Sequence, residues 1–166
     1  MLLWPVGMAL VTVWAVFHDA AIDYRVVVLG ALVPDIGDVA FGGARVLHTM
    51  AASVVVLVMV MLVTRGHRAA RRRWIFLPVG MFLHLVLDGM WARTATFWWP
   101  AFGWSLEGSL PFVDHGLAVL GAEEVAGALA LVWFWFRFRL GDAEARDRFV
   151  RTGRLPRDPL PRGREA

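Results

Sequence analysis

Four long apolar runs divide this chain of 166 residues. A helix needs roughly 20 apolar residues to cross a bilayer, with about 17 as a lower limit, so the two shorter runs reach that length only with help from their flanks. Hydrophobic residues make up 58% of the chain, which is too many for an ordinary soluble domain of this length. We therefore expect an all-α polytopic membrane bundle of about four transmembrane helices. The four runs are Leu2–Phe17, Met50–Thr64, Trp74–Ala92 and Gly116–Phe136.

A fifth apolar run, Val26–Val33, is too short to cross a bilayer. Arg25 precedes it and Pro34-Asp35 follows it, so we expect a short interfacial or re-entrant helix. After residue 140 the chain becomes polar and rich in Arg and Pro. The sequence therefore predicts a membrane-embedded helical domain over 1–140 and a polar cytoplasmic tail over 141–166.

The arginines predict the orientation. The loop Arg65–Arg73 holds five Arg and no acid, and nine more Arg follow Phe136. Short loops rich in Arg stay on the cytoplasmic side. We therefore expect a multi-pass protein of the inner or plasma membrane with both termini cytoplasmic, and with the connections 18–47 and 93–115 outside.

The chain contains neither cysteine nor lysine, and both absences limit its possible chemistry. The chain has no cysteine, which excludes disulfides and thiolate ligands, so a metal would need nitrogen and oxygen ligands. All 17 basic residues are Arg, and they lie beside the apolar runs. They are better interpreted as topology signals than as a nucleic-acid surface, so no nucleic-acid partner is expected.

His84 and Asp88 lie four residues apart within the third run. On a helix this spacing puts both side chains on one face. Ionisable groups at membrane depth are costly unless they are paired, hydrated or bound to a cation. The pair is therefore either a candidate metal site or a hydrogen bond that packs helices together.

Other acids and histidines gather near the ends of the runs. Asp35 and Asp38 share a face if Pro34 opens a helical turn, although acids also favour a helix N-terminus without any ligand. His48 opens the second run, where a lone histidine is usually only interfacial. His18 follows the first run and stays open as a further ligand.

The fourth run carries Glu123 and Glu124. Adjacent helical residues differ in direction by about 100°, so at most one of the two faces a site squarely. That glutamate is a candidate metal ligand or general base, and the other can hydrogen-bond. Arg45 and Arg93 are candidates to hold a substrate phosphate.

Three segments carry a resemblance: Gly30-Ala31-Leu32-Val33-Pro34-Asp35, then His48-Thr49, then His84-Leu85-Val86-Leu87-Asp88 followed by Thr96-Phe97-Trp98-Trp99-Pro100. In this order they resemble the YdjM-type membrane-bound metal-dependent hydrolases, which are distantly similar to zinc-dependent phospholipase C. The resemblance implies that Asp35, His48, His84 and Asp88 are metal ligands. It extends less directly to Asp38, because the family usually separates its two acids by one residue, and to His18, because the early histidine of the family often precedes the first span.

Mixed His and Asp ligands suit zinc, and also manganese or iron. The sequence therefore predicts a metal-dependent hydrolase that acts at the extracytoplasmic face on a phosphoester or lipid-like substrate, with membrane lipid around it. The alternatives are a non-catalytic membrane protein stabilised by a metal, and a small transporter or ion-handling protein. A homo-oligomer could supply further spans.

Overall fold

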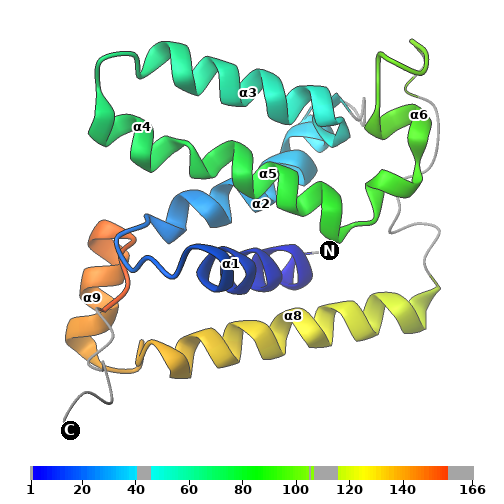
Figure 1. Ribbon diagram of the computed structural model, residues 1–166. Helices are drawn as coiled ribbons and strands as arrows, with labels where there is room; N and C mark the ends of the chain where they lie inside the picture. Colours follow the sequence, from blue (N-terminus) through cyan, green and yellow to red (C-terminus); the bar gives the residue numbers. More distant parts are fainter. Residues whose placement is uncertain (1, 41–45, 105, 107–115, 157–166) are drawn as a thin grey trace, which may run out of the picture.

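The computed structural model describes residues 2–40, 46–104, 106 and 116–156, and every regular element in these ranges is helical. The predicted all-α class is confirmed. The long helices lie side by side along one direction, and in Figure 1 they follow one another from top to bottom as α3, α4 with α5, α2, α1 and α8. Their bounds are α1 Leu3–Phe17, α2 Tyr24–Ala40, α3 Met50–Val63, α4 Arg68–Trp74, α5 Phe76–Leu87 and α8 Leu117–Arg137.

The predicted length of the helix at Val26–Val33 is wrong. These residues belong to the 17-residue helix α2, and Val27 and Ala31 are fully buried in the core. Arg25 does not end the helix, because its guanidinium is neutralised by Asp23. Pro34 does not end it either, since a proline inside a helix can be accommodated where another element satisfies the freed backbone groups.

Glycines set the spacing between the helices. A Cβ atom on Gly30 of α2 would overlap the carbonyl of Leu77, and one on Gly80 of α5 would overlap the carbonyl of Val27. Gly7 of α1 and Gly127 of α8 meet in the same way. Small residues at such crossings let two helix backbones approach closely, which is typical of helices packed in membranes.

One end of the bundle carries the loop Arg65–Arg73, and we call it the arginine end. Asp19 and Asp23 lie there as well, because Asp19 Oδ2 is 2.8 Å from Arg72 Nη2 and Asp23 Oδ2 is 2.9 Å from Arg73 Nε. The prediction placed the whole connection 18–47 at the opposite end from these arginines. That placement is wrong for the start of the connection, which contains Asp19 and Asp23. The reason is α2, which runs the length of the bundle instead of forming a short helix at one end.

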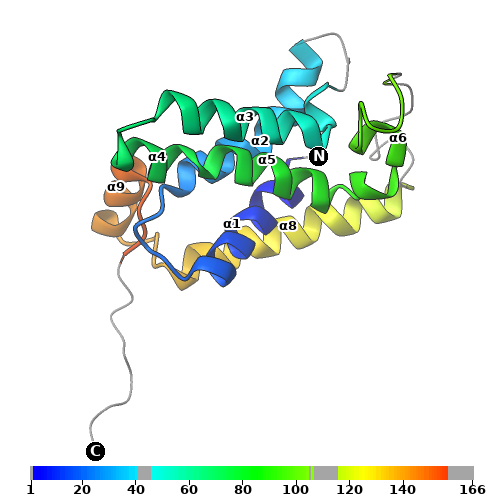
Figure 2. The same cartoon turned by 45° about the horizontal axis from the view of Figure 1, so that its top comes forward.

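The chain after residue 140 is not a separate tail. Helix α9, Ala143–Thr152, lies across the arginine end (Figures 1 and 2). Arg25 donates to the carbonyls of Val150 and Arg151, and Leu155 is 2% exposed within the core. The packed body therefore extends to residue 156, while the rest of the predicted tail lies outside the described residues.

Apolar side chains cover much of the outer surface of the bundle. In the described part of the chain, α8 is the one helix long and apolar enough to cross a membrane, and only 11% of its most apolar window is buried inside the protein. Helices α1 and α3 are shorter apolar helices. Exposed apolar residues on α3 and α8 include Val55, Met59, Leu62, Val63, Val125, Leu129, Val132 and Phe136.

Candidate metal centre

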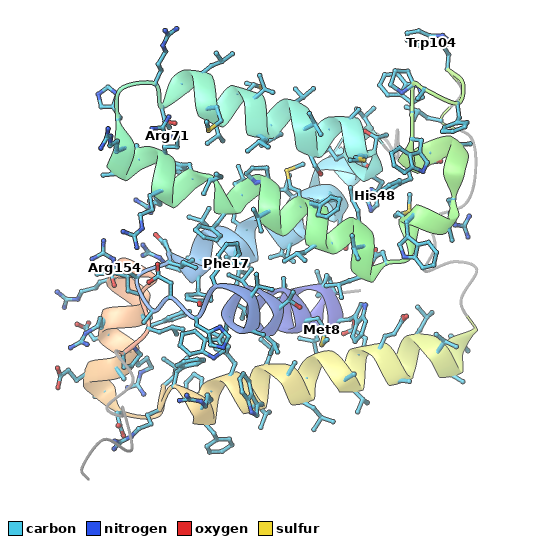
Figure 3. All side chains as sticks on the ribbon, viewed as in Figure 1. Met8, Phe17, His48, Arg71, Trp104 and Arg154 are labelled. Atoms are coloured by element: carbon cyan, nitrogen blue, oxygen red, sulfur yellow. The ribbon has the colours of Figure 1, made fainter. Side chains whose placement is uncertain are left out.

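Four side chains converge at the end of the bundle opposite the arginines. Asp35 comes from α2, His48 from the 3-10 turn η1 (Val46–His48), His84 from α5, and Asp88 from the residue that follows α5; each offers a ligand atom within 4.8 Å of the others. Figure 3 labels His48 at this end and Arg71 at the other. The sequence-based grouping of these four residues is confirmed.

Asp35 stands between the two imidazoles. Its Oδ1 lies 3.4 Å from Nε2 of His48 and 3.4 Å from Nε2 of His84. On the other side, Nε2 of His84 is 3.2 Å from Oδ2 of Asp88. The two carboxylates and the two Nε2 atoms therefore face one another across a single small space.

The orientation of His84 is set by a backbone carbonyl. Nδ1 of His84 donates to the oxygen of Ala31 at 2.7 Å, and because a carbonyl only accepts, Nδ1 must carry the proton. Nε2 of His84 therefore faces the carboxylates of Asp35 and Asp88, and a neutral ring would present the lone pair of this nitrogen to them.

His48 is held from behind by Asp38. Nδ1 of His48 lies 2.6 Å from Oδ2 of Asp38, and Oδ1 of Asp38 accepts the backbone N–H of Leu47 at 3.0 Å. Thr49 fixes the turn, since its side chain accepts the N–H of Ala52 as the N-cap of α3. Nε2 of His48 is thereby left to face Asp35.

Asp88 occupies the point where α5 ends. Its backbone N–H bonds to the carbonyl of His84 at 2.9 Å, and Gly89 follows with a φ of 67°. Glycine adopts this left-handed conformation without strain, so it is a common helix terminator. The carboxylate of Asp88 is thus kept one turn beyond His84 and on the same face.

The donor set fits a divalent cation. With both Nδ1 atoms bonded elsewhere, neutral imidazoles would present four acceptor atoms to one small space, which is the donor set that a cation needs. In the described part of the chain, Nε2 of His84 and Oδ1 of Asp88 are buried without a hydrogen-bond partner. Ligands held at about 2.0–2.1 Å around a tetrahedral ion lie roughly 3.3–3.4 Å apart. The pairs His48–Asp35, His84–Asp35 and His84–Asp88 are 3.4, 3.4 and 3.2 Å apart, and all four ligand atoms lie within 4.8 Å of one another.

Access to the site comes at Asp35. The side chain of His84 is fully buried and that of His48 is 2% exposed, whereas the side chain of Asp35 is 23% exposed. An apolar groove of about 260 Å³ lies between α3 and α5 and is lined by Met50, Leu83 and neighbouring side chains. None of the four candidate ligands lines this groove, although Met50 follows His48 by two residues and Leu83 directly precedes His84.

The other predicted site residues lie elsewhere. Asp38 contacts the rear of His48 rather than the space between the four ligand atoms. His18 lies exposed at the end of α1, next to Asp19 and hence at the arginine end, so the structure does not bring it to the site. The reason is the direction of α1, which starts near α5's last turn, where Trp4 Nε1 donates to the carbonyl of Leu87 at 3.1 Å.

Glu124 has a structural role. Its two carboxylate oxygens accept the backbone N–H groups of Leu2 and Leu3 at 2.9 and 3.2 Å, so it caps α1. Glu123 is half-buried on α8. Arg93 follows the 3-10 turn η2 (Met90–Ala92) and is half-buried as well, and Arg45 lies outside the described residues.

Two contributors to the site were missed by sequence reasoning. The carbonyl of Ala31 carries no residue-type signal, because any residue supplies one. Thr49 did carry a signal, since threonine directly before an apolar helix is a preferred N-cap. That cap would have identified the fixed turn at His48.

The fold and the site together define an all-helical bundle with a buried His/Asp cluster able to hold a metal ion. Comparisons with protein-family models, curated proteins and solved structures find no match. The function is therefore argued from the site itself.

Proposed function

We propose that this protein is an integral membrane metal-dependent hydrolase that cleaves a phosphoester in a lipid-like substrate. The observation that carries this proposal is the convergence of Asp35, His48, His84 and Asp88, with two of their polar atoms buried and without hydrogen-bond partners. Buried polar atoms are rarely left in this way unless a water or an ion belongs there.

The four side chains would hold a divalent cation, with zinc as the first candidate and manganese or iron as alternatives. Such an ion acidifies a bound water and polarises a phosphoryl oxygen. Asp38 and the carbonyl of Ala31 orient the imidazoles. Glu123 is the candidate base, since Glu124 is occupied in capping α1, and Arg93 is a candidate for holding a phosphate group.

Membrane insertion is supported by surface and composition. Helix α8 passes the length and hydropathy test for a span, and its apolar residues lie mostly on the outer surface. Soluble proteins rarely expose apolar patches of this extent. We propose that α1, α2, α3 and the α4–α5 pair cross the membrane beside α8.

The arginine end then lies in the cytoplasm, because short Arg-rich loops stay inside. The candidate metal centre lies at the extracytoplasmic face, as does the start of α1. Trp98, Phe102 and Trp104 are exposed, and Figure 3 labels Trp104 at the same end as His48, where aromatic side chains favour the interface. A substrate with a phosphate head and an apolar chain suits the groove between α3 and α5.

A second function has one observation in its favour. The cluster ties α2, η1 and α5 together, so a cation there would also hold the bundle closed without any chemistry. A non-catalytic metal-stabilised membrane protein is therefore the competing proposal.

Metal analysis tests the common part of both proposals. We expect about one equivalent of metal in the purified wild type and a loss of at least tenfold in Asp35→Asn and in His84→Ala. His67→Ala is the matched control, because His67 is an exposed histidine in the arginine loop. Sub-stoichiometric metal in the wild type that is unchanged in both site variants would falsify the proposal.

Hydrolysis separates the two functions. The metal-loaded protein in detergent is incubated with a panel of lipid and soluble phosphoesters. Metal-dependent release of phosphate or alcohol, lost in Asp35→Asn and retained in His67→Ala, supports the enzyme. A thermal unfolding temperature that depends on the metal, without turnover on any lipid phosphoester, supports the structural alternative.

A further inference from the structure

A second hollow lies at the arginine end, far from the candidate metal centre. It has a volume of about 560 Å³ and lies between the end of α1, the end of α3 and the start of α4–α5. One wall is apolar and contains Phe17, Met61 and Ile75. The other wall is formed by arginines of α4. The hollow is thus amphipathic, with its charged part at the membrane boundary proposed above.

The arginines Arg68, Arg71 and Arg72 project together, because residues three and four apart share a face of a helix. Arg72 is bound to Asp19 at 2.8 Å. No carboxylate in the described part of the chain pairs with Arg68 or Arg71, and Arg71 is half-buried. The hollow therefore has an excess of positive charge against an apolar wall.

A larger basic basin adjoins this hollow. It has a volume of about 910 Å³, and Arg68 and Arg72 line both cavities. Arg154 lines the basin, and its charge helps to lower the pKa of Asp19. Figure 3 labels Arg154 and Arg71 at the same end of the molecule as Phe17. An anion at the shared rim would meet arginines from two directions.

We propose that this hollow binds an anionic glycerophospholipid of the cytoplasmic leaflet. Its phosphate group would contact Arg68 and Arg71, and an acyl chain would lie along Phe17 and Met61, which are 50% and 41% exposed. Guanidinium groups bind phosphate by strong charge-assisted hydrogen bonds, and basic pockets between membrane helices suit lipid head groups. The apolar wall favours a lipid over a free phosphate, which gains nothing from it.

The test uses the whole protein in a neutral detergent with equal amounts of phosphatidylglycerol and phosphatidylcholine of the same acyl chains. Native mass spectrometry counts each bound lipid. We expect phosphatidylglycerol to be preferred by the wild type, and the double variant Arg68→Gln/Arg71→Gln to lower this preference roughly 30-fold. No preference in the wild type would overturn the proposal.

The matched control is Arg146→Gln/Arg148→Gln on α9, which removes the same charge outside the hollow. We expect this variant to keep the preference within about threefold; an equal loss in both double variants would indicate general charge attraction and overturn the proposal. Arg71→Lys keeps the charge and is expected to retain most of the preference, whereas a loss as large as in the double variant would overturn the role of charge.

Two further measurements complete the experiment. Displacement of the lipid by millimolar inorganic phosphate would assign the site to a free anion and overturn the lipid proposal. Metal content is expected to be unchanged in all of these variants. The lipid site can therefore fail while the proposed metal-dependent function stands, and the reverse also holds.

Discussion

The carboxylate of Asp38 holds the imidazole of His48 by its rear nitrogen, with Oδ2 of Asp38 2.6 Å from Nδ1 of His48. This contact leaves Nε2 of His48 for Asp35, which lies one helical turn earlier in α2. The two acids of α2 thus share a face, as their spacing predicts, and they approach the same ring from two sides. One is positioned to bind a metal and the other to orient a ligand.

Replacing Asp38 by Asn is expected to weaken metal binding about 10- to 100-fold, because residues that orient a histidine ligand have effects of this size. The backbone N–H of Leu47 keeps an acceptor in the variant, so the turn should survive. Zinc titration of metal-free protein measures the change. Asp142→Asn at an exposed surface pair serves as control, and equal affinity in Asp38→Asn and wild type would contradict the orienting role.

The close packing of α2 against α5 positions the site, and Gly80→Ala tests whether this packing is needed. A Cβ atom at Gly80 would come within 2.9 Å of the backbone of both Gly30 and Ala31, whose carbonyl holds His84. We expect a loss of about 1–3 kcal/mol in stability and a lower metal content.

Gly121→Ala is the matched control for Gly80→Ala, since no atom of the described residues lies within 4 Å of a Cβ atom at that position of α8. There the substitution should raise stability by up to about 1 kcal/mol, because alanine favours the helix. Thermal unfolding and metal analysis compare the two variants. Similar unfolding temperatures in both would show that the close crossing is unimportant.

Apolar periodicity was enough to locate α1, α3 and α8, whose ends agree with the predicted runs to within one or two residues. It failed for α2, because Arg25 and Asp35 were taken as the limits of a short helix. Both residues lie beside tertiary partners, Arg25 beside Asp23 and carbonyls of α9, and Asp35 beside the two histidines. Such partners cannot be deduced from local composition.

The error in the length of α2 also explains which site residues were placed correctly and which were not. His84 and Asp88 depend only on helical spacing, which the sequence contains. The position of His18 depends on which end of the bundle α1 reaches, and this end follows from the full length of α2. Prediction therefore succeeded where local helical spacing decides and failed where the number of helices that run along the bundle decides.

The capping role of Glu124 predicts a loss of stability without a loss of metal. Removing its carboxylate in Glu124→Ala leaves the N–H groups of Leu2 and Leu3 without their acceptor, which should cost about 1 kcal/mol. Metal content should not change. Thermal unfolding and metal analysis measure both effects.

Glu123→Gln separates the two neighbouring glutamates. If Glu123 is the base of the proposed reaction, its loss should lower turnover by about 10²- to 10⁴-fold with little effect on stability. Glu124→Ala should retain most of the turnover of the wild type. The reverse pattern, with turnover abolished only in Glu124→Ala at unchanged stability, would assign the base to Glu124.

Asp23 is expected to make the stability of the protein depend on pH through its contacts at the arginine end. Burial alone would raise the pKa of this carboxyl, but hydrogen bonds and charges from Arg25 and Arg73 hold the pKa below its usual range. A lowered pKa in the folded protein contributes stability above the unfolded-state value of about 3.9, and this contribution is lost as the pH falls through the folded-state pKa.

Asp23→Asn should therefore lower stability by about 2 kcal/mol at pH 7, and the stability of the variant should decrease less than that of the wild type between pH 5 and pH 3. Thermal unfolding of metal-free protein at each pH measures this difference. Glu144→Gln, at an exposed pair on α9, is the control and should follow the wild type. Parallel pH curves for Asp23→Asn and wild type would show that the carboxylate does not stabilise the contact between α9 and the start of α2.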